Sequence, residues 1–222
     1  MRLATCFLLA LVCLRGDTLD QILARMDADA ANFHGVKAQL ERVEYTASIK
    51  DTSRSKGQLT IFKPKKGMAA LLEYTSPDPK QLQFKDGTAL EYLPNINTIN
   101  EYDMGKYSSV VNEFMMLGFG SSGQDLKKSY SINYVGPEML GDQKVTKLEL
   151  KPKKAEALQY MNKIEFWILD GKSYAVQLKI YQPSGDWDTA IYTGVQLNPP
   201  GLNEHWVELK TLKNPKREKI NK

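Results

Sequence analysis

Apolar residues recur with two different periods along the chain, and the change of period separates a helical start from a long β region. From Thr18 to Phe33 they return every three or four positions, which predicts an amphipathic helix. Thr18 and Gln21 stand three residues apart, as in a capping box, so the helix is expected to begin beside them. A second, shorter helical pattern covers Tyr107 to Leu117.

Beyond Leu40 the chain consists of short segments rich in Val, Ile, Thr, Tyr and Phe, separated by turns. Apolar and polar residues alternate in segments such as 58–61 and 147–151, which predicts strands with one buried face. Turns at intervals of roughly 8–12 residues favour antiparallel pairing. About ten or eleven strands are too many to lie flat, so we expect an incomplete antiparallel β-barrel, mainly β, with the helices covering its open side.

The N-terminal sixteen residues have the pattern of a secretory signal peptide. Arg2 is followed by an uninterrupted apolar run from Leu3 to Leu14, too short to span a bilayer. Both cysteines, Cys6 and Cys13, fall inside this segment, so a chain cut after residue 16 has no thiol. The sequence therefore predicts an exported, periplasmic protein with one domain over residues 17–222. A lipid-modified Cys13 is the alternative, although Val12 fits a lipidation signal poorly.

The charge balance excludes a nucleic-acid partner. The whole chain carries +4, and removal of residues 1–16 leaves 28 basic against 26 acidic residues. Positive charge gathers only in the tail, residues 213–222, which we interpret as a solvated end, with contact to an acidic partner or anionic lipid as the alternative.

Three glycines, Gly118, Gly120 and Gly123, match the G-x-G-x-x-G pattern of dinucleotide-binding loops. That loop must follow a strand, whereas this one follows the second helical pattern, so we disfavour a nucleotide site. A glycine-capped helix end and a flexible loop explain the pattern. The neighbouring Phe114 and Met115 are compatible either with core packing or with a mobile lid over an apolar cavity.

Catalytic residues are not recognisable. His34 and His205 lie far apart and no cysteine accompanies them, which makes a metal site a poor interpretation. Asp186 and Asp188 flank Trp187 and could act as an acid–base pair on a sugar, but a turn leading into a strand explains them equally well. We therefore expect no enzyme, no cofactor and no metal, and keep a hydrolase using these aspartates as a distant alternative.

The stretch from Gly57 to Pro94 resembles the LolA family of periplasmic carriers of outer-membrane lipoproteins. The resemblance rests on this series: Gly57-x-Leu59, Lys63-Pro64, Glu73-Tyr74, Pro77, Asp86-Gly87, Leu90, Tyr92 and Pro94. Segments 135–153, 163–170 and 184–188 resemble the second half of such lipoprotein-sorting proteins.

This resemblance implies an incomplete barrel of about eleven strands whose apolar interior shields acyl chains. It also implies a monomer that takes lipoproteins or lipids from an inner-membrane lipoprotein-releasing transporter to an outer-membrane acceptor. In the family, a basic residue before the proline latches the lid. Lys63 holds that position, where the best-known carriers have Arg, so a weaker latch is expected.

The strand pattern and the resemblance together predict the site. Gly118, Gly120 and Gly123 are expected to form the lid hinge. A one-residue slip would turn any strand residue to the other face. A membrane-tethered lipoprotein receptor or envelope sensor on the same fold is the alternative function. The residues expected to face the cavity are Leu59, Ile61, Leu72, Tyr74, Leu82, Phe84, Leu90, Tyr92, Phe114, Met115, Phe166, Ile168 and Leu178.

Overall fold

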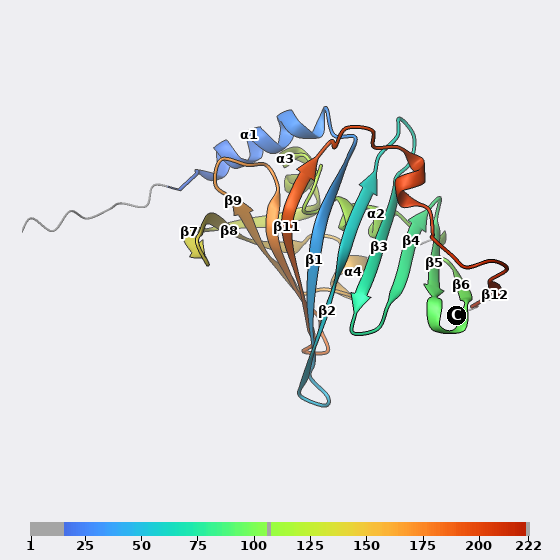
Figure 1. Ribbon diagram of the computed structural model, residues 1–222. Helices are drawn as coiled ribbons and strands as arrows, with labels where there is room; N and C mark the ends of the chain where they lie inside the picture. The colour runs from blue at the N-terminus through green and yellow to red at the C-terminus, as the bar shows by residue number, and fades with distance from the viewer. Residues whose placement is uncertain (1–15, 106–107, 221–222) are drawn as a thin grey trace, which may run out of the picture.

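The computed structural model describes residues 16–105 and 108–220, which form one strongly curved β-sheet with helices on one side (Figure 1). The described chain contributes twelve strands, in the spatial order β12-β6-β5-β4-β3-β2-β1-β11-β10-β9-β8-β7. All neighbours are antiparallel except β12 and β6, which are parallel. The strands are β1 (Gly35–Thr46), β2 (Asp51–Phe62), β3 (Ala69–Ser76), β4 (Lys80–Lys85), β5 (Thr88–Leu93), β6 (Thr98–Asp103), β7 (Tyr130–Leu140), β8 (Gln143–Pro152), β9 (Lys163–Leu169), β10 (Ala175–Tyr181), β11 (Trp187–Leu197) and β12 (Lys216–Lys219).

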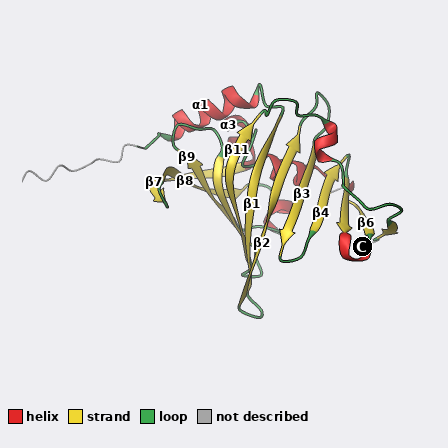
Figure 2. Cartoon of the chain, in the orientation of Figure 1, coloured by secondary structure: helices red, strands yellow, loops and turns green. Residues whose placement is uncertain are grey.

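The helices gather on one face of this sheet, which we call the inner face (Figure 2). They are α1 (Leu19–Ala30), α2 (Ser108–Met116), α3 (Gly123–Ser129) and α4 (Ala155–Leu158), with 3₁₀ turns at Pro94–Ile96 and Glu204–Val207. The prediction of a mainly β fold with a helical cover and an unclosed barrel is thus confirmed, because β7 and β12 remain separate edges. No helix in the described ranges is long and apolar enough to cross a membrane.

Helix α1 begins where its sequence predicts. The Thr18 side chain accepts a hydrogen bond from the Gln21 N–H, and the Gln21 side chain accepts one from the Thr18 N–H at 2.9 Å, which completes a capping box. Just before it, the Asp17 carboxylate accepts the Gly171 N–H and pairs with Arg25, so the start of the fold is fixed to the loop after β9. The predicted signal segment, with Cys6 and Cys13, lies outside the described residues apart from Gly16.

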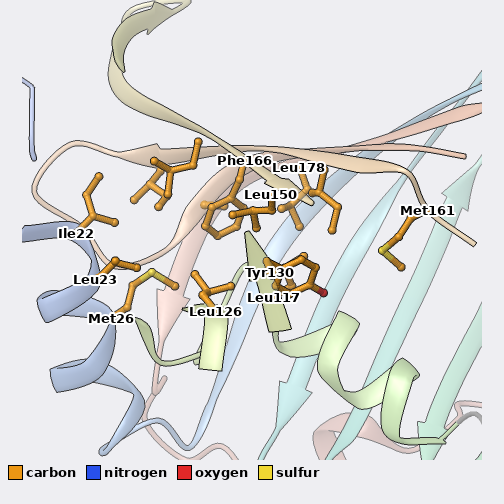
Figure 3. Close-up of a cluster of buried hydrophobic side chains, with 14 residues drawn as sticks. Ile22, Leu23, Met26, Leu117, Leu126, Tyr130, Leu150, Met161, Phe166 and Leu178 are labelled. Carbon is orange, nitrogen blue, oxygen red and sulfur yellow. The ribbon is translucent and has the colours of Figure 1, made fainter. Parts of the chain in front are cut away.

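The main core fills the space between the inner face and the helices α1 and α3. Figure 3 shows Ile22, Leu23 and Met26 of α1 and Leu126 of α3 directed at strand residues such as Phe166. Burial of these side chains, at roughly 1.5–3 kcal/mol each, is the main favourable contribution to this packing. The apolar stripe predicted for the first helix therefore has the covering role expected of it.

The outer face of the sheet is also partly covered, which the sequence did not reveal. The segment after β11 crosses β3 and β4, where Val207 packs against Ala69 and Leu71. Gln83 donates a hydrogen bond to the Val207 carbonyl at 2.7 Å and fixes this crossing. His205 lies in a 3₁₀ turn of this segment. One interpretation therefore changes: residues 216–219 of the basic tail form β12 rather than a solvated end.

Candidate functional site

An apolar cavity of about 320 Å³ lies between the inner face and α2. Strands β1 to β4, β10 and β11 form its floor, and three residues of α2, Val111, Phe114 and Met115, form its cover. The volume is at the lower end of the range of small-molecule sites. The full lining is Leu40, Arg42, Leu59, Leu72, Tyr74, Leu82, Phe84, Val111, Phe114, Met115, Gly118, Met161, Leu178, Ile180, Asp188, Ala190 and Tyr192.

Most of the residues expected to face the cavity are brought together there. On the floor, each faces inward because cross-strand partners share a face: Leu59 pairs with Leu72, and Leu72 pairs with Leu82. Binding of a ligand by these residues remains a prediction. The residues that line the cavity as expected are Leu59, Leu72, Tyr74, Leu82, Phe84, Phe114, Met115 and Leu178.

Leu90 and Tyr92 lie on the outer face, contrary to prediction. Leu90 is the cross-strand partner of Gln83, and Tyr92 is the partner of Gln81. Since both glutamines bond to the C-terminal segment on the outer face, their partners share that face. The Tyr92 hydroxyl accepts the Leu212 N–H at 3.0 Å, so this tyrosine fastens the segment rather than lining a site.

Three other expected residues face inward but do not reach the cavity. Phe166 and Ile168 belong to the core beneath α1 and α3, and Ile61 packs with Phe33 and Phe119. Ile61 and Phe166 are 0% exposed. The prediction that these side chains face inward was right, but helices and the 118–123 segment fill the space above them.

The three glycines belong to a closely packed connection between α2 and α3. Gly120 has φ +77°, and a Cβ there would lie 2.4 Å from the Phe33 ring. Gly123 opens α3 against α1, with a Cβ position 2.7 Å from the Leu23 carbonyl oxygen. Close approach, rather than a nucleotide, explains these two glycines. The expected flexible loop ends at Gly123, and the hinge role remains a prediction.

Lys63 lies just after β2, at the end of the sheet near α1. Its N–H donates a hydrogen bond to the His34 carbonyl at 2.8 Å, and its ammonium lies 6.0 Å from the centroid of the Phe33 ring. Among the described residues Lys63 makes no ion pair with α2. A latch between this lysine and the helical cover therefore remains a prediction.

One ion pair interrupts the apolar lining of the cavity, and sequence reasoning missed its cationic member. Arg42 of β1 donates to Asp188 of β11 from Nε at 2.7 Å, and its Nη2 contacts the same carboxylate oxygen. Nη2 also lies 3.0 Å from Glu44. Burial lowers the pKa of the Arg42 guanidinium, but the hydrogen bond and charge of Asp188 raise this pKa by more than burial lowers it. The net shift favours the charged form. The sequence did contain an indication of this: Arg42 stands two residues after Leu40 in the same strand, so both side chains face inward.

The carboxylates considered for catalysis each have a structural partner. Asp186 accepts a hydrogen bond from the Ala47 N–H at 2.7 Å, which joins the β10–β11 turn to the β1–β2 turn. Asp188 pairs with Arg42. Burial also raises the pKa of Tyr74 and of Tyr192 beside this pair, which keeps both hydroxyls neutral. Within the described residues, no group of three His, Cys, Asp or Glu side chains is placed to hold a metal ion.

The fold is shared with solved structures of very different sequence. The chain is similar to an uncharacterised conserved protein from Thermus thermophilus, with a TM-score of 0.54 and 10% identity over 92% of this chain and 100% of that one. It is similar to the lipoprotein LppX of Mycobacterium tuberculosis, with a TM-score of 0.50 and 13% identity over 84% and 98%. A LolA superfamily protein from Nitrosomonas europaea gives a TM-score of 0.38 and 11% identity over 87% and 98%.

The similarity to the Thermus thermophilus protein and to LppX shows that this chain shares their fold. No protein-family model and no curated protein matches the sequence.

Proposed function

We propose that the protein binds the acyl chain of a lipid or lipoprotein in the inner cavity and shields it from water during transfer between membranes. The observation that carries this proposal is the cavity itself, which is lined by leucine, phenylalanine and methionine side chains and covered by a short helix. A chain held this way needs apolar area rather than specific polar contacts. The presence of a lipoprotein among the proteins that share the fold supports a setting in which such chains occur.

The size of the cavity sets the expected affinity. At ~30 Å³ for a group the size of water, 320 Å³ holds about ten such groups. Ten methylenes at ~0.8 kcal/mol each contribute about 8 kcal/mol. Association costs of at least ~4 kcal/mol offset part of this gain. The net gain is therefore at most about 4 kcal/mol, which corresponds to a dissociation constant of about 1 mM or weaker and suits a carrier that must release its cargo.

The cellular setting completes the proposal. We infer export by the N-terminal segment, residence in the periplasm, and action as a monomer without chemistry. The expected partners are an inner-membrane lipoprotein-releasing transporter, which loads the carrier, and an outer-membrane acceptor, which receives the cargo.

The first test is to identify what the exported protein carries. Protein purified from the periplasm would be examined by native mass spectrometry, and anything released on denaturation identified. An acyl lipid or lipoprotein is expected. Protein that is empty, and that fails to take up a fluorescent acyl probe, would refute the proposal.

A cavity-filling variant separates binding from folding. Ala190 lines the cavity, so Ala190→Phe should fill the space while the sheet stays intact, and probe binding should fall about tenfold or more. Leu212→Phe, at a side chain 62% exposed, is the control and should bind as the unaltered protein does. Equal binding by both variants would place the lipid elsewhere.

A further inference from the structure

The ion pair inside the cavity has an unbalanced hydrogen-bonding arrangement. Both contacting nitrogens of Arg42, Nε and Nη2, meet the same oxygen of Asp188, Oδ2. The other oxygen, Oδ1, accepts no hydrogen bond from the described residues. The Asp188 side chain is 17% exposed and that of Arg42 is 32% exposed, so this edge of the pair is accessible from the cavity. A hydrogen-bond donor and an acceptor are thus offered side by side at the end of an apolar site.

The charges around the pair select against an anion. Arg42 has a second carboxylate, Glu44, 3.0 Å from Nη2, so one cation is shared by two anions. Tyr74 and Tyr192, which also line this end, are neutral. A carboxylate head group placed here would face a net negative charge. Even at the dielectric constant of water, one such repulsion at about 4 Å weakens binding about fivefold.

We propose that the cavity selects an acyl chain whose polar end is an uncharged amide, because an amide supplies both an N–H for Asp188 and a carbonyl for Arg42. This inference rests on the proposed acyl-chain binding and adds the class of head group. A free fatty acid lacks the donor and carries the wrong charge, and an ester lacks the donor. The cavity volume limits the enclosed part to a single chain of about ten carbons.

Three ligands with the same chain test this selection. Decanamide, sodium decanoate and methyl decanoate would compete against a fluorescent acyl probe at neutral pH. We expect decanamide to bind at least ten times more tightly than decanoate, with the ester between them. In the double variant Arg42→Met, Asp188→Leu, the preference should fall to less than twofold while the ester still binds. Up to about ten carbons, each added methylene should raise the binding affinity about fourfold. Methylenes beyond the tenth should bring no such gain.

The outcomes separate this inference from the function beneath it. If all three ligands bind but decanoate equals or exceeds decanamide, or if the preference survives in the double variant, the amide proposal is wrong and acyl-chain binding stands. If none binds, both proposals fail. The amide could belong to an acylated peptide terminus or to a small lipid, and a decanoyl dipeptide compared with N-decanoylethanolamine assigns the source.

Discussion

Removing both partners of the Arg42–Asp188 ion pair should destabilise the protein less than the sum of the two single removals. Loss of one partner from a fully buried pair costs about 3–5 kcal/mol, because a charge is left in an apolar environment. Here the Arg42 side chain is 32% exposed and Glu44 remains beside it. Solvent screening therefore reduces the expected cost of Asp188→Leu, or of Arg42→Met, to about 1–3 kcal/mol. The double variant should recover about 1–2 kcal/mol of the summed loss.

Urea unfolding of the four proteins, followed by tryptophan fluorescence, gives the coupling energy directly. Strands β1 and β2 provide a control on the outer face, where Arg54 contacts Glu41 at 2.8 Å with side chains 64% and 32% exposed. That pair should couple by no more than about 0.5 kcal/mol. If the effects of the two substitutions at the cavity pair add within ~0.5 kcal/mol, the pair is not an interacting unit and the amide-binding geometry loses its basis.

Three further predictions concern stability. Gly123→Ala should cost about 1–3 kcal/mol in urea, since the new methyl would lie 2.7 Å from the Leu23 carbonyl oxygen and separate α3 from α1. Thr18→Ala should lower the unfolding free energy by about 1 kcal/mol through loss of the capping box. Glu165→Gln should flatten the fall in stability on acidification: burial raises the pKa of Glu165, but Lys147 and neighbouring donors lower it below its ordinary value of 4.5. A carboxyl with a lowered folded-state pKa contributes stability above about pH 4.5, and this contribution is lost as the pH falls further.

Each of these has a matched comparison and a result that contradicts it. Gly118→Ala places its methyl 3.3 Å from the flexible end of Leu178 and should cost less than Gly123→Ala. Thr18→Ser keeps the cap and should be near neutral. An unchanged pH profile between pH 3 and pH 5 in Glu165→Gln would mean that the Lys147 ion pair, 3.1 Å long, does not form in solution.

The sequence predicted local structure where one periodicity was unambiguous. The capping residues and apolar stripe gave α1, and the alternation around Leu59 placed that residue correctly. Strand β5 was assigned to the wrong face because it has apolar residues of both parities, Leu90 and Tyr92 on one face and Ala89 and Leu93 on the other. The cause is long-range: the C-terminal segment buries the outer face there, so the hydrophobic pattern has no single direction.

The extent of the cavity depended on similar long-range packing. Phe166 and Leu178 are cross-strand partners on the inner face, yet only Leu178 lines the cavity while Phe166 lies under α1 and α3. No local pattern distinguishes a core position from a cavity wall, because the difference is set by whichever helix lies above it. Strand β12 was missed for a different reason: the sequence Lys-Arg-Glu-Lys has no apolar residue, and the strand joins the sheet through backbone pairing with β6.

The parallel pairing of β12 with β6 has a consequence for how the chain folds. Residues 98–103 are synthesised more than a hundred residues before their partner, and until residues 216–219 arrive, β6 presents a row of unpaired backbone groups. Such an edge is a template for intermolecular strand pairing and aggregation, and the wait is long because the contact is so distant in sequence. The charged side chains of β12, which add nothing to the core, therefore serve the protein by ending the sheet with a strand that other chains pair with poorly.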